Sequence, residues 1–585
     1  MSHKFVVIDE IMEQMEAAKS GIVPGSVTQA VVSGIQNVPS NIKQSRIGGA
    51  AAASYTTFPL SPIVKNCCLD KTYLNFEFEV NFNMTFNGLT ANKRQKIPFY
   101  LGLRDNASIF NQLQILIENS AIWTTTYQRE ESVLSYNSLP ETEIRGNNQY
   151  ASIEKMREGK YCPMKRYIVD ISAAKAQENT TVLIKQHFKI TIDINRLTPL
   201  LSNLHFTTPH MGNLRLKVFM QEFEKCLFIC PDYNYFVNIK PSGVDQPAKI
   251  MEVLDQPFLN QYWQFYPFYK FTGTGAEAAS IPFFAYNVDD KKIVRPSKVI
   301  IADPSEGDFM TFDKGGIAEI VQTCFDIKDE EYQRLTDYFA SLGSVIIPSQ
   351  TWSTNVFNNS QITGKANAIF PQTQIGNIGG YNLDFISVWT HPNAHPCTFT
   401  NEYLKDIQLI LDGRPINPIP YQYVSDKCVV DTTQAIIDTD HEEINHDYIS
   451  SLTLFNETDN NQYIDKSLTE YYGDGTANNG LTRNYIANPN TFALNFSTNL
   501  PDAFHSGACI LENSNRQAVL RYNAQSAIDN NPNLAHSTFP MLINHKSDDV
   551  VSGFSSFCDC CIVLTYDPAR QTCFDGQLSW AAPYA

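Results

Sequence analysis

Apolar and polar residues alternate without interruption between Leu74 and Phe86. The apolar members of this series are Leu74, Phe76, Phe78, Val80, Phe82, Met84 and Phe86. Successive side chains of a β-strand point to opposite faces, so the pattern predicts one long strand with a buried face and a face in contact with water. Strands of this kind are typical of antiparallel sheets, which commonly cover only one of their faces.

Two further segments, 184–194 and 214–220, show the same period. Their apolar residues are Ile184, Phe188, Ile190, Ile192 and Ile194 in the first segment, and Leu214, Leu216, Val218 and Met220 in the second. No series of amphipathic helices alternates with these segments, which argues against a parallel α/β sheet. Aromatic residues make up 12% of the chain, and they suit the pleated surface of a sheet. The sequence predicts an all-β fold, either a sandwich or a barrel.

One segment has the period and the boundaries of an α-helix. Asp329–Leu342 places its large apolar residues on one stripe, begins with three acidic residues and is followed by Gly343. Acidic residues favour the first turn of a helix, and glycine is typical of the position just after its last turn. Weaker helical patterns cover residues 151–159 and 433–451. We expect all three helices to lie in connections between strands.

The first 54 residues differ in composition from the rest of the chain. A short amphipathic helix is predicted over residues 4–19, and residues 21–54 are mostly small or polar, with too few large apolar groups to bury themselves. Residues 1–54 are therefore interpreted as an N-terminal arm. Such an arm is either a mobile terminus without a task or a tether that orders against a neighbouring subunit, an inner layer or a membrane.

The chain contains an internal repeat. Residues 113–122 align without gaps to residues 407–416, and Tyr127-Gln128 matches Tyr421-Gln422. The offset of 294 is close to half of the 585 residues. A strand followed by a turn is common in β proteins, so a coincidence is the alternative explanation. A true repeat predicts two similarly built β domains in tandem.

The predicted helix at 329–342 separates these two domains. The first domain is expected over residues 55–345 and the second over residues 346–585. Residues 241–326 are too long for an ordinary connection, and we expect them to form outer loops and contacts between subunits. Within them, residues 262–269 are dense in aromatic side chains, which is typical either of an interface or of a core strand.

Charge and cysteine content restrict the function. The chain has 44 Lys and Arg against 61 Asp and Glu, a net charge of −17, and no basic run, so direct binding of nucleic acid is not expected. The 13 cysteines are an odd number and no apolar signal segment follows the first methionine. We expect synthesis in the cytoplasm, with free thiols and without secretion. No apolar run approaches the roughly 20 residues of a membrane-spanning helix.

Two motifs resemble catalytic or cofactor sites but lack the required spacing or context. His441 and His446 are five positions apart, about 140° around a helix, whereas the zinc-protease motif places both histidines on one face. Residues 273–278 fit the loosest dinucleotide-binding fingerprint, yet the sequence that follows contains Pro282 and is typical of a strand rather than of a phosphate-binding helix. Both are interpreted as surface loops or loop helices.

Two further candidates are better explained by structure than by chemistry. Cys558, Cys560 and Cys561 look like half of a metal knuckle, but the chain has no second cysteine pair at the usual spacing. They are interpreted as buried thiols of a strand. His187 lies on the polar face of a predicted strand and is expected to face solvent. The sequence thus predicts no catalytic residue, no cofactor and no metal ion.

Two segments carry a resemblance to a known family. The first runs from Phe504 to Cys509, with the sequence Phe-His-Ser-Gly-Ala-Cys, and is followed by Asn513-Ser514 and Leu520-Arg521-Tyr522. The second runs from Ile194 to Asn203 and leads to Gly212-Asn213-Leu214. With the tandem β domains and the arm, these segments resemble the double jelly-roll major capsid proteins of virophages, Polinton-like viruses, adenovirus-type hexons and large DNA viruses. His505 departs from the family pattern, which has proline there.

The resemblance implies a fold and a function. It implies two tandem eight-stranded antiparallel jelly rolls with a few loop helices, and three chains that form a trimer of six similar barrels. Such a pseudo-hexameric capsomer would tile the icosahedral shell of a double-stranded DNA virus, in the virion, beside neighbouring capsomers, penton proteins and minor capsid proteins. Capsid proteins of the mavirus kind are the nearest match in length and in the character of the arm.

Two other classes of protein compete with this interpretation. A large β-sandwich that cleaves or binds polysaccharides remains open, because the two carboxylates of a glycosidase have no local sequence signature. A secreted adhesin is disfavoured by the odd number of thiols and by the lack of a signal segment.

Overall fold

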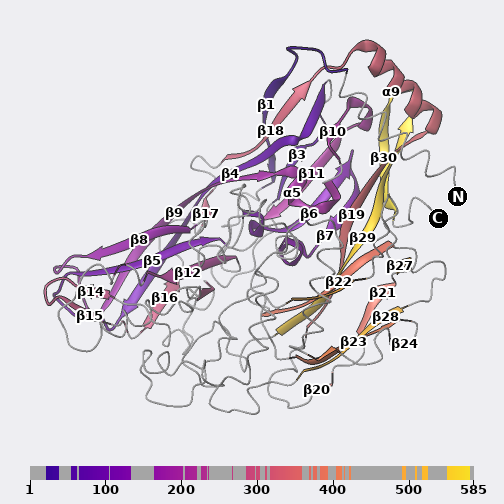
Figure 1. Ribbon diagram of the computed structural model, residues 1–585. Coiled ribbons are helices and arrows are strands. Elements are labelled where there is room, and N and C mark those ends of the chain that lie inside the picture. The colour runs from indigo at the N-terminus through magenta and orange to yellow at the C-terminus, as the bar shows by residue number, and fades with distance from the viewer. Residues whose placement is uncertain are drawn as a thin grey trace.

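The structure is a computed structural model of the whole chain. It describes the segments 21–37, 55–61, 65–103, 106–132, 164–201, 204–220, 226–232, 235, 266–267, 285–294, 296, 298–302, 310–311, 317–358, 368–369, 373–377, 382–392, 404–411, 414–415, 421–422, 491–495, 508–509, 517–524 and 550–579. Most of these residues belong to antiparallel strands (Figure 1). Within these segments, no helix is both long enough and apolar enough to cross a membrane.

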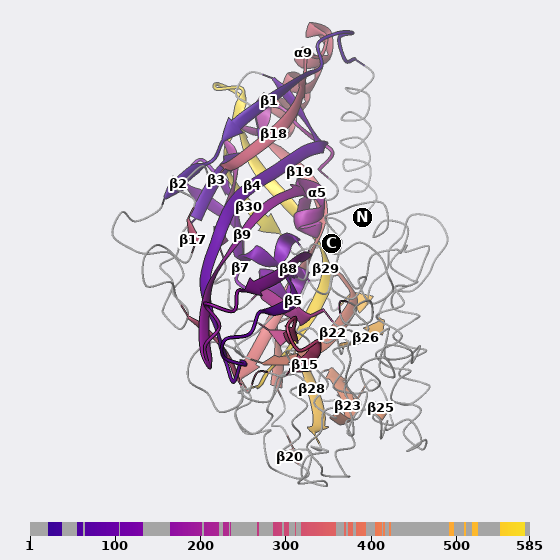
Figure 2. The same ribbon diagram turned by 90° about the vertical axis from the view of Figure 1, so that its left-hand side faces the viewer.

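The first sheet of the N-terminal half is organised around the longest strand of the chain. β4 (Asn66–Asn87) pairs on one edge with β18 (Ile317–Phe325), which in turn pairs with β1 (Thr28–Ser33). On its other edge β4 pairs with β9 (Asn179–Asp193) and with the short β10 (Phe206–Thr207). Figure 2 shows β4 and β9 running side by side along most of their length.

The second sheet of the N-terminal half faces the first. Its strands follow the order β2 (Ile35–Asn37), β3 (Tyr55–Pro59), β11 (Leu214–Met220), β6 (Phe110–Ile117) and β7 (Ser120–Thr125). All of these pairs are antiparallel.

The connectivity of these two sheets is that of a jelly roll. In chain order, the first strand (β1) pairs with the eighth (β18), the second (β3) with the seventh (β11), the third (β4) with the sixth (β9 and β10), and the fourth (β6) with the fifth (β7). Four nested antiparallel pairs wrap into two sheets when the eighth strand also pairs with the third and the seventh with the fourth. Both of these pairings are present, β18 with β4 and β11 with β6.

The first sheet of the C-terminal half repeats this order. β19 (Ser344–Asn358) pairs with β29 (Val550–Asp567), and β29 also pairs with β22 (Asn382–Pro392). β22 then pairs with β26 (Thr491–Asn495) and with β27 (Ala508–Cys509). The order is again first, eighth, third and sixth. β29 is extended by a hairpin to β30 (Thr572–Ser579).

The second sheet of the C-terminal half completes the repeat. β28 (Gln517–Ala524) pairs on one side with β20 (Ala368–Ile369) and β21 (Thr373–Asn377). On its other side it pairs with β23 (Leu404–Leu411), which pairs with β24 (Arg414–Pro415) and β25 (Tyr421–Gln422). This is the order second, seventh, fourth and fifth. The predicted fold, an all-β chain with two tandem antiparallel jelly rolls, is therefore confirmed.

The internal repeat of the sequence falls on equivalent strands. Residues 113–122 cover the end of β6 and the start of β7, and residues 407–416 cover the end of β23 and all of β24. Ile117 pairs with Ser120 in the first half, and Leu411 pairs with Arg414 in the second, so both connections have two residues. The match is therefore structural and not a coincidence of composition.

A third sheet extends the N-terminal half beyond the jelly roll (Figure 1). Its centre is β5 (Gln95–Leu103), which pairs with β8 (Met164–Ile171), β12 (Leu227–Pro231) and β14 (Ala285–Asn287). Two short strands complete this sheet: β13 (Tyr266–Pro267) and β15 (Lys292–Val294). These strands are insertions between the jelly-roll strands.

Two ranges predicted from composition contain strands of the sheets. β1 and β2 lie within residues 1–54, the predicted arm. The range 241–326, predicted as a loop insertion, includes β14 and β15, β16 (Lys298–Ala302), β17 (Met310–Thr311) and β18. Here the prediction extended too far, because β16, β17 and β18 all pair with β4, and β18 is the eighth strand of the jelly roll. Local composition does not report such long-range pairing.

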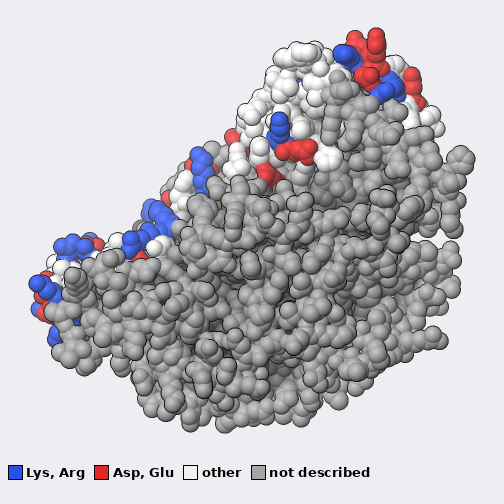
Figure 3. Space-filling model, viewed as in Figure 1, with Lys and Arg blue, Asp and Glu red and all other residues white. Residues whose placement is uncertain are grey.

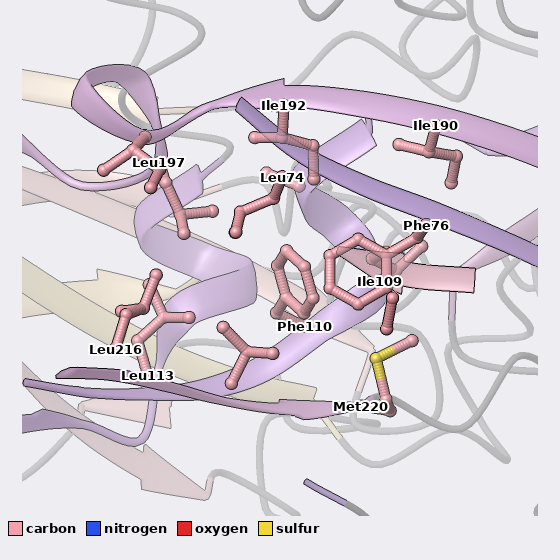
Figure 4. Packing of buried hydrophobic residues seen from close by; sticks show 14 of the residues in the cluster. Leu74, Phe76, Ile109, Phe110, Leu113, Ile190, Ile192, Leu197, Leu216 and Met220 are labelled. Atoms are coloured by element: carbon pink, nitrogen blue, oxygen red, sulfur yellow. The ribbon is translucent and has the colours of Figure 1, made fainter. Parts of the chain in front are cut away.

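The alternating pattern of the sequence builds the core of the N-terminal half. Along β4 the apolar residues from Leu74 to Phe86 are buried, and their polar neighbours are partly exposed, as predicted. Figure 4 shows this face packed against β6 and β11. Phe76 contacts the ring of Phe110 edge-on, with 5.3 Å between centroids. The apolar residues of β9 and β11 face the same core, which confirms the two shorter patterns.

The helix predicted between the halves is present with the expected bounds. α9 covers Asp329–Leu342, and Gly343 ends it in the left-handed conformation, with φ 66° and a backbone N–H donated to the Phe339 carbonyl at 2.9 Å. The helices predicted at 4–19, 151–159 and 433–451 lie outside the described residues. The connection after β9 contains α5 (Ile194–Leu197), followed by a 3-10 turn, η3 (Pro199–Leu201).

Candidate functional site: the junction between the two halves

α9 connects the last strand of the first jelly roll to the first strand of the second. Its buried side chains are Leu335, Thr336 and Phe339, and its three acidic residues lie in the exposed first turn. Figure 3 shows acidic and basic side chains together at this end of the molecule, over α9. The inner side of the helix packs on a short 3-10 turn of the first half, η4 (Pro209–Met211), and on β29 of the second.

His210 is completely buried at the place where these elements meet. Its Nε2 lies 2.8 Å from Thr336 Oγ1 on α9, and its Nδ1 lies 3.3 Å from Thr208 Oγ1. The imidazole ring also packs on Tyr332, with 4.3 Å between ring centroids, and on Phe339 and Tyr566. One side chain of the first half thus contacts both the connecting helix and the second half.

The hydrogen bonds of Thr336 determine which nitrogen of His210 carries the proton. Thr336 Oγ1 donates its proton to the Tyr332 carbonyl at 2.9 Å. The same oxygen can therefore only accept from His210, so Nε2 carries the hydrogen and Nδ1 accepts one from Thr208. Burial lowers the pKa of His210 to about 4, because the charged imidazolium is poorly solvated there. The ring is neutral at physiological pH.

Next to His210, the backbones of the two halves come so close together that only glycine fits. Gly212 has φ +71°, and a Cβ atom at this position would lie 2.1 Å from the carbonyl oxygen of Cys573 on β30. On the same side, Thr572 Oγ1 donates to the Pro209 carbonyl at 3.3 Å. The connection between the sixth and seventh strands of the first jelly roll is therefore in direct contact with the last hairpin of the second.

A chain of polar groups crosses the junction at a second place. Trp389 Nε1 donates to Ser555 Oγ at 3.0 Å, and Ser555 Oγ lies 2.8 Å from Thr354 Oγ1. Thr354 in turn donates to Glu131 Oε1 at 3.1 Å. The first three residues belong to β22, β29 and β19 of the second half, and Glu131 belongs to the first half, just after β7.

Glu131 is nearly inaccessible, with 5% of its surface exposed. Burial raises its pKa to about 8, and the hydroxyls of Thr125 and Thr354 only partly oppose that effect. The adjacent Glu130, which is also buried, raises it further. The carboxyl group of Glu131 is therefore mostly protonated at neutral pH, which removes the cost of a buried charge.

Apolar packing joins the two halves between these polar contacts. Buried residues of the second half belong to the same hydrophobic cluster as the core of the first: Val345, Ile347, Cys560, Ile562, Leu564, Tyr566 and Cys573. Ser349 on β19 donates to the Leu200 carbonyl at 2.5 Å. β30 lies against β7, and a Cβ atom on Gly576 would meet Leu564 and Ile122. A shared core of this kind holds two domains in one fixed orientation.

The predicted chemical candidates take structural positions. His187 lies on the outer face of β9, with its side chain half exposed and its Nε2 3.0 Å from Glu77 Oε1. Cys558, Cys560 and Cys561 are all buried in β29, as predicted for thiols of a strand. His441, His446 and residues 273–278 lie outside the described residues. Among the described residues, no three His, Cys, Asp or Glu side chains gather closely enough to hold a metal ion.

Sequence reasoning missed His210 and Glu131. Neither stands in a motif, and their burial depends on partners between about 120 and 360 positions away in the chain, beyond the range of local periodicity. The sequence Pro209-His210-Met211-Gly212 offers one weak signal, since proline followed by glycine is typical of a turn.

The chain was compared with known proteins. No protein-family model and no curated protein matches it. Solved structures with a similar fold include the mavirus major capsid protein, at 9% identity over 96% of this chain and 92% of that chain, with a TM-score of 0.43. The PBCV-1 virus capsid matches at 9% identity over 95% and 97%, with a TM-score of 0.40, and the Faustovirus major capsid protein at 8% over 96% and 98%, with 0.41. At such identities and TM-scores, the fold assignment rests on the strand order of this chain itself.

Proposed function

We propose that this protein is a major capsid protein, and that three copies form a pseudo-hexameric building block of an icosahedral viral shell. The observation that carries the proposal is the duplication itself. The chain contains the same nested strand order twice, and α9 with a shared core holds the two copies in one fixed orientation. The division of the chain into two domains at α9 is part of this proposal.

The duplication matters because of symmetry. A trimer with threefold symmetry contains six jelly rolls, and similar barrels at fixed spacing approximate a hexagon. Six barrels give such a unit an approximately hexagonal outline, whereas a trimer of single barrels has only three. The junction at His210 and Glu131 would keep the two barrels of each chain at one fixed spacing.

The proposal includes partners. Neighbouring trimers would meet at the outer sides of the barrels, and penton and minor capsid proteins would fill the positions where six-sided units do not fit. The net charge of −17 supports an assembly that does not itself bind the genome. The protein would accumulate in the virion. Length and the character of the arm favour a capsid of the mavirus kind.

Solution size and shape test the trimer. Size-exclusion chromatography with light scattering is expected to give about 198 kDa, three times the chain mass of 66.0 kDa. Negative-stain images should then show particles with six-sided outlines. A monomer that binds or cleaves polysaccharides would contradict the proposal and would favour the β-sandwich enzyme or carbohydrate-binding protein.

A deletion that removes part of the arm but leaves the sheets intact tests the role of the arm. Removing residues 1–20 leaves β1 intact, and we expect trimers to form but to assemble poorly into larger shells. Removing residues 1–37 also deletes β1 and β2, so it should lower the stability of the folded chain as well. Normal assembly after the shorter deletion would exclude the proposed tether.

A further inference from the structure

Two cysteines face each other across the seam between the third and eighth strands of the first jelly roll. Cys67 on β4 is the register partner of Cys324 on β18. Cys67 is fully buried and Cys324 retains 3% of its surface. They are 257 positions apart in the chain, so only the folded sheet brings them together.

The sheet geometry suits a covalent bond between these two residues. Directly opposite residues of an antiparallel pair have Cα atoms about 4.5 to 5.5 Å apart and side chains on the same face. A disulfide needs a Cα separation of roughly 4.4 to 6.8 Å. Both side chains are buried at this seam, where Cys67 Sγ lies 3.3 Å from Thr72 Oγ1. No large movement of the backbone is required to join the two sulfur atoms.

The two thiols differ in reactivity. The neighbouring Cys67 thiol is the main factor that lowers the pKa of Cys324, and the charge of Lys65 lowers it further, although burial acts against both. The proximity of Cys324, together with burial, raises the pKa of Cys67. Because the thiolate is the reactive form and Cys324 is the member of the pair that retains some exposed surface, we assign Cys324 as the nucleophile and Cys67 as the thiol that resolves the product.

We propose that Cys67 and Cys324 form an oxidation site, at which a small peroxide converts the two thiols into a disulfide between β4 and β18. The bond would fasten the eighth strand to the third a few residues before α9 begins. It would close a loop that contains nearly the whole N-terminal half, and so restrict the unfolded chain strongly. The disulfide would form when the folded subunit leaves a reducing compartment, and it would then stabilise the folded subunit.

The reaction is balanced with hydrogen peroxide as the oxidant. The Cys324 thiolate attacks one peroxide oxygen, the O–O bond breaks, and a sulfenic acid and hydroxide form. Cys67 gives its proton to that hydroxide, and its thiolate attacks the Cys324 sulfur. The S–O bond breaks, hydroxide leaves and takes up a proton to become water. Two thiols lose two electrons in total, and one peroxide is reduced to two molecules of water.

The test uses the full-length, reduced protein and peroxide at neutral pH. After removal of peroxide, the chain is unfolded and its remaining thiols are alkylated without reductant. We expect the chain to lose two of its thirteen thiols, and a tryptic map to contain one linked pair of peptides with Cys67 joined to Cys324. The oxidised protein should also unfold at a temperature several degrees higher, and the increase should disappear with reductant.

Cys68 provides the matched control. It is the direct neighbour of Cys67, is more exposed, and has Thr323 as its register partner. Cys68→Ser should therefore still form the link, whereas Cys67→Ser and Cys324→Ser should abolish it. Cys67 and Cys68 lie on one tryptic peptide, 66–71, so fragmentation of the linked peptide pair by mass spectrometry locates the bond in the unaltered protein even if a serine variant fails to fold. Retention of all thirteen thiols, or a link through Cys68, would overturn the proposal.

Discussion

The imidazole Nε2 of His210 lies 2.8 Å from Thr336 Oγ1, although the two residues are 126 positions apart. This bond joins η4 of the first jelly roll to the helix that leads into the second. Because Thr336 gives its own proton to the Tyr332 carbonyl, the bond depends on the Nε2–H tautomer of a neutral histidine. The junction between the halves therefore contains a polar contact that is sensitive to both substitution and pH.

Thr336→Val is expected to destabilise the protein. Valine has nearly the shape of threonine but leaves the Nε2–H of His210 buried without an acceptor, which costs about 1 to 3 kcal/mol. Urea unfolding at pH 7.5, followed by tryptophan fluorescence, measures the change. Thr336→Ser keeps the hydroxyl and should lose less stability than the valine variant. Equal losses for both variants would show that the hydroxyl of Thr336 does not contribute to stability.

Acid should weaken the fold through His210. Its pKa is lowered from 6.5 to about 4, so the unfolded chain binds more protons than the folded chain between these values. The stability contribution is complete above pH 6.5 and is lost as the pH falls towards 4, by about 3 kcal/mol in total. The nearby Tyr332, Tyr566 and Cys573 all have pKa values raised by burial and do not titrate in this window.

His210→Gln tests this dependence. Glutamine can donate to Thr336 but does not titrate, so the decline of unfolding free energy between pH 6.5 and 4 should become shallower. His187→Gln is the matched control, because His187 lies half exposed on β9 beside Glu77. If both variants keep the slope of the unaltered protein, His210 is not the group responsible.

Glu131 should make the protein less stable as the pH rises, whereas His210 makes it less stable as the pH falls. The pKa of Glu131 is raised from 4.5 to about 8, so the folded chain binds more protons than the unfolded chain between these values. Stability therefore falls as the pH rises from 4.5 through 8, and Glu131→Gln should remove this loss. We expect the variant to exceed the unaltered protein by several kcal/mol at pH 8.5 and by little at pH 4.5.

Glu330→Gln serves as the control for Glu131. Glu330 lies in the exposed first turn of α9, where a change of charge has little effect on stability. Denaturation midpoints at pH 4.5 and pH 8.5 are sufficient for the comparison. A Glu131→Gln variant that loses stability at pH 8.5 would contradict the buried, protonated state of this carboxyl group.

Gly212→Ala should be costly for two separate reasons. Alanine is strained at φ +71°, and its methyl group would lie 2.1 Å from the Cys573 carbonyl oxygen. Gly25 provides a control, since it has φ +79° but no atom within 4 Å of the added methyl group. We expect a loss of about 1 kcal/mol for Gly25→Ala and about 3 kcal/mol or more for Gly212→Ala. Thermal unfolding of both variants should distinguish the cost of the positive φ, which both share, from the cost of the steric clash with the Cys573 carbonyl, which only Gly212→Ala has.

Several features of the fold follow from neighbouring residues alone. The alternation from Leu74 to Phe86 corresponds to the buried face of β4, and the acidic start and glycine stop of 329–342 correspond to α9. The repeat offset of 294 also predicted equivalent strands, β6 and β23. Each of these signals is carried by residues close together in the sequence, where side-chain direction depends on backbone conformation.

The pairing of strands could not be predicted from neighbouring residues. The composition of residues 28–33 is that of a flexible arm. They nevertheless form β1, because they pair with the edge of β18, almost 300 positions later in the chain. Likewise, Cys67 meets Cys324, and His210 meets Thr336, only once the sheets have closed. Periodicity predicts which side of a strand is buried, but the choice of neighbour depends on the free energy of the whole core, to which both halves of the chain contribute.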